Sequence, residues 1–92
     1  MKSVVWSKAS LDSLETIHNF IFQNSPQNAE MVVETLLKLG DDLAKFPERN
    51  SKEPLFNAEA IRYFPKWNFK IVYRIEENRI LIINIYSTKM NW

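Results

Sequence analysis

The sequence has no cysteine and only one glycine and one histidine among its 92 residues. The absence of cysteine excludes disulfides, thiolate metal sites and cysteine nucleophiles, and it fits a reducing cytoplasm. One glycine is too few for the loops that cradle nucleotide phosphates, and one histidine excludes a cluster of imidazole ligands. No apolar run approaches the ~20 residues of a membrane span, and no secretory signal opens the chain. We therefore expect a soluble protein without a metal or an organic cofactor.

The composition predicts one compact domain over residues 1–92. The chain is 46% hydrophobic and 25% charged and has three tryptophans, which argues against disorder. Its net charge of +1 hides an uneven distribution. Residues 1–48 carry four basic and seven acidic side chains, a net charge of −3, whereas residues 49–92 carry eight basic and four acidic side chains, a net charge of +4. The C-terminal half is therefore the half that could face an acidic partner.

The N-terminal half predicts a strand followed by two helices. Residues 2–6 favour a short strand, and a helix then runs from an N-cap at Ser7 to about Gln23. Ser25 and Pro26 suit the start of a second helix, which the apolar spacing carries to Phe46, before Pro47. The two helices should form a hairpin. Gly40 inside the second helix costs about 1 kcal/mol relative to alanine, which suggests either a close crossing at that position or a glycine on the helix surface.

The C-terminal half predicts three strands after a loop at 48–57. Residues 58–64 favour a strand that ends before Pro65, and residues 69–76 alternate between two faces. Glu77-Asn78 predicts a two-residue hairpin turn with positive φ, and residues 80–86 predict a central strand covered on both faces. The order is β-α-α-β-β-β. We expect an α+β fold in which a helical hairpin packs on one face of a small, mainly antiparallel sheet, with the first strand at the sheet edge.

Four segments together resemble the RelE/ParE superfamily of type II toxin-antitoxin systems, whose members are often described as plasmid stabilisation proteins. These segments are "VVWSKASLDSLETIHNFI", "SPQNAEMVVETLLKLGDDLAKFP", "IRYF" and "FKIVYRIEENRILIINIYSTKMN". The resemblance implies a small cytoplasmic bacterial toxin that inhibits growth. It also implies a cognate antitoxin, encoded beside the toxin, that neutralises it in a toxin-antitoxin hetero-oligomer. Superfamily members are either RelE-like, ribosome-dependent mRNA endonucleases or ParE-like inhibitors of DNA gyrase.

The C-terminal stretch "YSTKMN" bears on the choice between these two activities. Cleavage of RNA through its 2′-OH needs a base, an acid and cations that stabilise the phosphorane. This stretch contains neither an imidazole nor a carboxylate, and Lys70 stands where the nuclease pattern usually has arginine. Glu59 and Arg62, three residues apart in a strand, should point to opposite faces and so make a poor acid-base pair. His18, next to the apolar stripe of its helix, is interpreted as a structural or surface residue and not as a general base.

We therefore favour a ParE-like toxin that acts by binding DNA gyrase over one that acts as an enzyme. Its candidate target contacts combine the basic residues of the C-terminal half with two tryptophans outside the expected core. They are Arg62, Lys66, Trp67, Lys70, Arg74, Lys89 and Trp92.

Two alternatives stay open. In the first, the protein is a ribosome-dependent mRNA endonuclease that uses cations and a tyrosine at Arg62, Lys70, Tyr86 and Lys89. In the second, it has lost its toxicity and is retained as a folded antitoxin partner.

Tyr73 shares a strand face with three apolar residues and is predicted to lie in the core.

Overall fold

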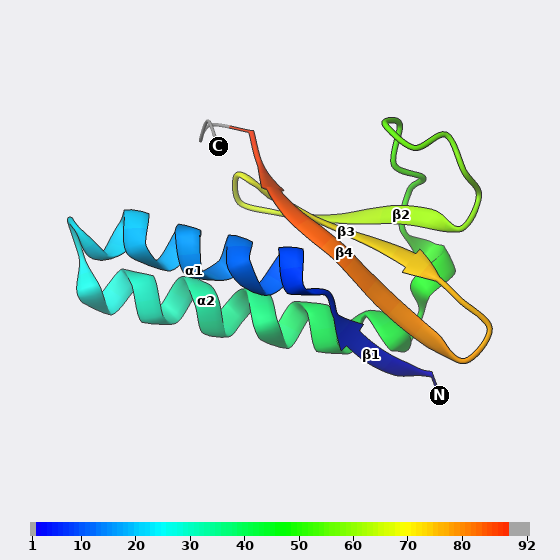
Figure 1. Cartoon of the computed structure of the whole chain (residues 1–92), viewed down its shortest axis with the longest axis horizontal. Coiled ribbons are helices and arrows are strands. Elements are labelled where there is room, and N and C mark those ends of the chain that lie inside the picture. Colours follow the sequence, from blue (N-terminus) through cyan, green and yellow to red (C-terminus); the bar gives the residue numbers. More distant parts are fainter. Residues whose placement is uncertain (1, 89–92) are drawn as a thin grey trace.

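The computed structural model describes residues 2–88 and shows a four-stranded sheet with two long helices along one side of it (Figure 1). The sheet order is β1-β4-β3-β2, so the N-terminal strand lies at an edge, as predicted. In chain order the elements are β1 (Ser3–Trp6), α1 (Lys8–Phe22), α2 (Pro26–Asp41), η1 (Asp42–Ala44), η2 (Pro47–Arg49), β2 (Ile61–Lys66), β3 (Phe69–Ile75) and β4 (Arg79–Ser87).

Both long helices begin at the serines that the sequence marks. The Ser7 hydroxyl accepts a hydrogen bond from the Ser10 amide, and the Ser25 hydroxyl accepts one from the Asn28 amide. Each hydroxyl satisfies one of the amides that a helix N-terminus leaves without an internal partner. Ser7 also donates to the Ile83 carbonyl oxygen at 2.7 Å, so the cap ties α1 to β4.

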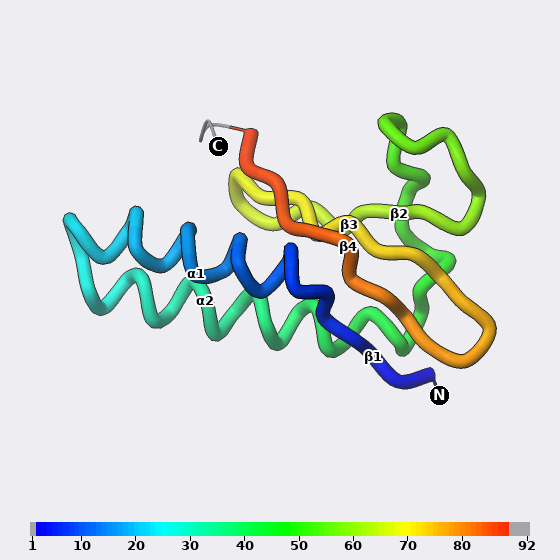
Figure 2. The backbone as a smooth tube through the Cα atoms, viewed as in Figure 1, coloured from blue at the N-terminus to red at the C-terminus, as the bar shows by residue number. Residues whose placement is uncertain are grey.

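The sheet is mixed: β1 pairs with β4 in parallel, and the other pairs are antiparallel. In the β3–β4 ladder, Val72 pairs with Asn84 and Tyr73 with Ile82, which leaves Ile83 as the extra residue of a bulge. Figure 2 shows that the backbone of β4 bends close to the start of α1, which packs against this strand. The bulge thus lies where the strand leaves β1 and begins to pack against α1.

The core lies between the helix pair and the facing side of the sheet. Its fully buried apolar side chains are Ile17, Ala29, Leu36, Ile71, Tyr73, Ile80, Ile82 and Ile85. Gly40 is a close crossing, as predicted: a Cβ at this position would lie 2.2 Å from Cζ2 of Trp6. The Trp6 indole nitrogen donates to the neighbouring Asp41 carboxylate at 3.0 Å, which fixes the ring over the glycine.

The structure corrects two predicted element boundaries. The α-helical part of the second helix ends at Asp41, not Phe46, because the chain tightens there into the 3-10 turn η1. Strand β2 begins at Ile61 and continues through Pro65 to Lys66. An edge strand tolerates proline because the missing N–H can face away from the ladder.

Two predicted features of β4 and its hairpin are also corrected. The strand is buried on the helix side at Ile80, Ile82 and Ile85, but Leu81 and Ile83 remain partly exposed, because the helices cover one face only. The two-residue turn at 77–78 is present, yet neither of its residues has positive φ; in residues 2–88 only Asn57 and Trp67 do.

Candidate binding surface

Arg62 is held by the loop that precedes its strand. Its Nη1 donates to the carbonyl oxygen of Asn50 at 2.7 Å and to that of Glu48 at 3.3 Å. The Tyr73 hydroxyl joins the same turn, donating to the Pro47 carbonyl oxygen at 2.6 Å and accepting from the Asn50 amide at 3.0 Å. Burial raises the pKa of Tyr73. Arg62 and Tyr73 thus fix the 47–50 backbone against the sheet, and Tyr73 is core, as predicted.

The basic residues of β2 and β3 do not share one face of the sheet. Arg62 pairs across the ladder with Tyr73, whose side chain is in the core, so Arg62 lies on the helix side. Lys70 pairs with Pro65, and Arg74 with Ile61, on the opposite face. The candidate cations are therefore divided between the two faces of the sheet.

Lys70 is paired with a buried glutamate. Its ammonium lies 2.9 Å from Oε1 and 2.8 Å from Oε2 of Glu53, whose side chain is 0% exposed. The same ammonium lies 4.5 Å above the Tyr63 ring, a cation–π contact. The Leu55 amide makes a long contact of 3.4 Å with Oε1 of Glu53. Lys70 therefore anchors the 51–57 loop to β3, and Glu53 was not among the residues that the sequence singled out.

Glu59 and Arg62 are closer than the sequence suggested. The opposite-face argument fails because Glu59 lies in the turn before β2, outside the strand. Its Oε2 lies 3.6 Å from Nη2 of Arg62, and its Oε1 accepts from Lys52 at 3.1 Å. The Glu59 side chain is 81% exposed, so these contacts are weak and solvated.

The β2–β3 turn carries an exposed basic and aromatic pair. Trp67 has φ 53° and is 51% exposed, and the Lys66 ammonium lies 4.7 Å from the centre of its ring. A bulky residue in the left-handed region is uncommon and costs conformational energy. Beside the turn lies a groove of about 370 Å³, called here the Trp67 groove, lined by Ile21, Asn28, Met31, Val32, Trp67, Asn68 and Phe69.

Arg74 belongs to a surface ion network at the other end of the sheet. Glu76 binds Nη2 of Arg74 at 2.7 Å and Nε of Arg79 at 2.5 Å. Hydrogen bonds from Arg79 and then Arg74 hold the pKa of Glu76 below its usual value. Arg74 keeps 45% of its side chain exposed, so it remains reachable although its charge is paired.

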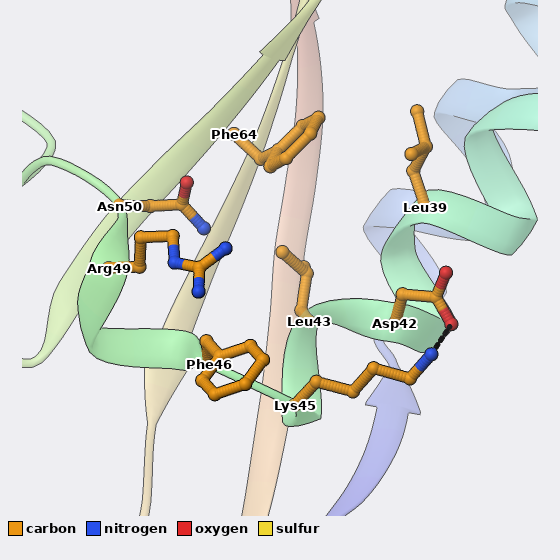
Figure 3. Close-up of a pocket in the computed structure, with 8 residues that line it drawn as sticks. All are labelled: Leu39, Asp42, Leu43, Lys45, Phe46, Arg49, Asn50 and Phe64. Atoms are coloured by element: carbon orange, nitrogen blue, oxygen red, sulfur yellow. Dashed lines mark ion pairs between the residues drawn. The ribbon is translucent and has the colours of Figure 1, made fainter.

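A second groove, of about 290 Å³, opens between the end of α2, the two 3-10 turns and β2. It is called here the Phe46 groove, and it is lined by Leu39, Asp42, Leu43, Lys45, Phe46, Arg49, Asn50 and Phe64. Figure 3 shows the Arg49 guanidinium between the rings of Phe46 and Phe64, with the Asp42–Lys45 ion pair at the far side. The Arg49 guanidinium carbon lies 4.4 Å from the centre of the Phe46 ring.

Of the remaining candidate residues, the structure describes Tyr86 and His18. Tyr86 pairs with Lys70 in the β3–β4 ladder and is partly exposed. Lys89 and Trp92 lie outside the described residues. His18 lies 3.3 Å from Glu30 across the helix hairpin, a placement that fits its interpretation as a structural residue.

The fold and sequence together identify the family. A family model described as the ParE toxin of the type II toxin-antitoxin system parDE matches residues 4–92. The chain belongs to the ParE toxin family. No curated protein matches the sequence. A solved chain described as "Chromosomal ParDE TA system from P. aeruginosa" is similar with a TM-score of 0.81 and 18% identity, over 97% of this chain and 98% of that chain. This likeness shows the common fold.

Membership of the ParE family confirms the predicted superfamily and its ParE-like branch, and the α+β fold is confirmed with it. Among residues 2–88 of this ParE-family chain, no three histidine, aspartate or glutamate side chains are grouped as metal ligands. Within the same range, no helix is long and apolar enough to cross a membrane. Within residues 2–88, the candidates for contact with a macromolecule are the exposed cations, the exposed aromatics and the two grooves.

Proposed function

We propose that this ParE-family toxin inhibits DNA gyrase by binding it, without cleaving a substrate, and that a cognate antitoxin neutralises the toxin in a hetero-oligomer. The observation that carries the proposal is that Arg62 and Lys70, the two cations best placed in sequence to bind a phosphate, already have partners within the protein. Arg62 donates to two loop carbonyls, and Lys70 pairs with the buried Glu53. Both cations hold the 47–57 segment in place.

The Glu53 pair makes a catalytic use of Lys70 costly. Turning Lys70 toward a phosphate would leave the Glu53 carboxylate buried without a cation, and breaking a buried pair in this way costs about 3–5 kcal/mol. Binding to a protein surface needs no such rearrangement. It needs exposed anchors, and aromatic and basic residues are enriched among the side chains that dominate binding energy.

Lys66 and Trp67 are the target contacts that the geometry favours most among residues 2–88. Both belong to the β2–β3 turn, and the ring of Trp67 is half exposed beside the apolar Trp67 groove. Arg74 is a weaker candidate because it is already paired with Glu76. Contacts through Lys89 and Trp92 stay predictions.

Inhibition of purified bacterial DNA gyrase in a DNA supercoiling assay tests the proposal. We expect the toxin to inhibit supercoiling and Trp67→Ala to raise the concentration needed at least tenfold. Lys8→Gln, which removes an exposed cation from α1, serves as the control and should inhibit like the parent protein. If the parent protein leaves supercoiling unaffected at every molar ratio, gyrase is not the target.

Pulse labelling after induction without antitoxin separates the remaining alternatives. The proposal expects an early loss of DNA synthesis with intact mRNA. An early loss of protein synthesis with breaks in ribosome-bound mRNA would instead identify an endonuclease that uses Arg62, Lys70, Tyr86 and Lys89. Harmless expression of folded protein would identify a chain that has lost its toxicity.

A further inference from the structure

We propose that the Phe46 groove is a docking site for a peptide segment that combines apolar side chains with one carboxylate, and that Arg49 is the residue that recognises the carboxylate. The proposal does not depend on the gyrase target or on an antitoxin. It rests on the lining of the groove, the placement of Arg49 and the local balance of charge.

Half of the eight residues that line the groove are apolar, and one of these is strongly exposed. Phe46 is 63% exposed, an unusual state for an aromatic ring, and Phe64 and Leu43 line the same space. Exposed aromatic surface around a concavity is typical of a place where another molecule packs. The groove holds about 290 Å³, which is enough for two or three side chains but too small for a folded domain.

Arg49 gives the groove its chemical preference. Its guanidinium stacks on the Phe46 ring at 4.4 Å, and within residues 2–88 it has no carboxylate partner. The other charges of the lining compensate each other, since Asp42 and Lys45 lie 3.6 Å apart. The lining therefore presents one uncompensated positive charge, and a guanidinium fork binds a carboxylate through two parallel hydrogen bonds.

The position of Arg49 is fixed before any ligand arrives. Residues 47–50 are tied to the sheet through the Pro47 carbonyl, which Tyr73 binds, and the Asn50 carbonyl, which Arg62 binds. A side chain that starts from a fixed backbone and rests on a ring loses less entropy on binding than a free one. Arg62, which sequence reasoning placed in a target or phosphate site, here supports Arg49.

Two blocked peptides that differ in one group test the proposal: acetyl-Leu-Ala-Glu-Leu-amide and its glutamine counterpart. Each is titrated into the 15N-labelled protein, and the amide chemical shifts of residues 43–46, 48–50 and 64 are followed. We expect the glutamate peptide to perturb these resonances and to bind about tenfold more tightly than the glutamine peptide, since one charge-assisted pair distinguishes them.

Arg49→Gln should abolish the preference, so that both peptides bind this variant equally and weakly. Phe46→Ala should weaken the binding of both peptides to the same extent, because it removes one apolar wall of the groove and leaves the Arg49 guanidinium in place. Lys8→Gln has the same net charge as Arg49→Gln and should keep the preference, which excludes a general electrostatic effect.

Three results would overturn the proposal. Equal affinity of the two peptides for the parent protein would make the groove merely apolar. Perturbations confined to the Trp67 groove would place the site elsewhere. Sedimentation showing a dimer that Phe46→Ala converts to a monomer would make a second copy of the chain the occupant, in place of a partner peptide.

Discussion

Substitution of Gly40 by alanine separates two opposing effects on stability. In an exposed helix interior the change would stabilise the protein by about 1 kcal/mol, because glycine loses more backbone entropy on folding. At this position the added methyl group would lie 2.2 Å from Cζ2 and 2.6 Å from Cη2 of Trp6, and 2.9 Å from Cδ1 of Ile82. Carbon atoms in good contact are about 3.5–4.0 Å apart, so the overlap exceeds 1 Å.

The clash outweighs the gain in helix propensity. Overpacking of a well-packed core costs about 1–3 kcal/mol, and the depth of this overlap places the cost near the upper end. The indole can move away only by giving up its hydrogen bond to Asp41. We therefore expect Gly40→Ala to lower the free energy of unfolding by about 2 kcal/mol, and at 4–8 °C per kcal/mol the midpoint should fall by about 10 °C.

Thermal and urea unfolding followed by far-UV circular dichroism measure this change. The matched control is Gly40→Ala in a Trp6→Leu background, where the two clashing ring atoms are gone and only the flexible end of Ile82 remains near. In that background alanine should cost at least 1 kcal/mol less, a coupling that identifies the Trp6 ring as the cause. A parent protein that Gly40→Ala stabilises by ~1 kcal/mol would refute the close-crossing argument.

Two further predictions concern the loop and its anchors. Lys70→Met should lower the free energy of unfolding in urea by about 3 kcal/mol, because it leaves the Glu53 carboxylate buried and unpaired. The double variant Lys70→Met, Glu53→Leu should recover most of this loss. A double variant as unstable as Lys70→Met would contradict this account. The pKa of Tyr73 is raised above 10.0 in the folded state. The contribution of the neutral hydroxyl to the free energy of unfolding is therefore fully present below about pH 10 and is lost as the pH rises toward the folded pKa. Stability measured between about pH 9 and 11 should therefore fall more steeply for the parent than for Tyr73→Phe, and equal slopes would argue against burial of the hydroxyl.

Local sequence signals predicted the parts of the fold that depend on local physics. Ser7 and Ser25 mark helix starts because their hydroxyls satisfy amides three residues away, and both caps form as predicted. Gly40 was recognised because a glycine inside a helix has a measurable cost that a close contact can explain. The edge position of the first strand was also predicted, but its parallel pairing with β4 was not.

The contacts of the 47–60 segment could not be predicted in the same way. Glu53 lies in a run of polar residues that has no periodicity, and its burial depends on Lys70, seventeen positions later. Arg62 points to the helix side because it pairs with Tyr73, and a slip of one residue in the β2–β3 register would have reversed its face. The Phe46 groove arises where α2 tightens into a 3-10 turn, which the apolar spacing alone did not distinguish from a longer helix.

The parallel pairing of β1 with β4 has a consequence for how the protein is made. Ser3 pairs with Arg79, and Trp6 with Ile82, so the first strand cannot pair until the last strand has been made. Closing so long a stretch of chain is slow, because its entropy is lost before the contacts that repay it can form. While the chain is being synthesised, the helical hairpin can form early, but the sheet edge stays open until β4 has left the ribosome exit tunnel. A chain cut short before residue 79 would lack the partner of β1 and also the strand on which the core is built.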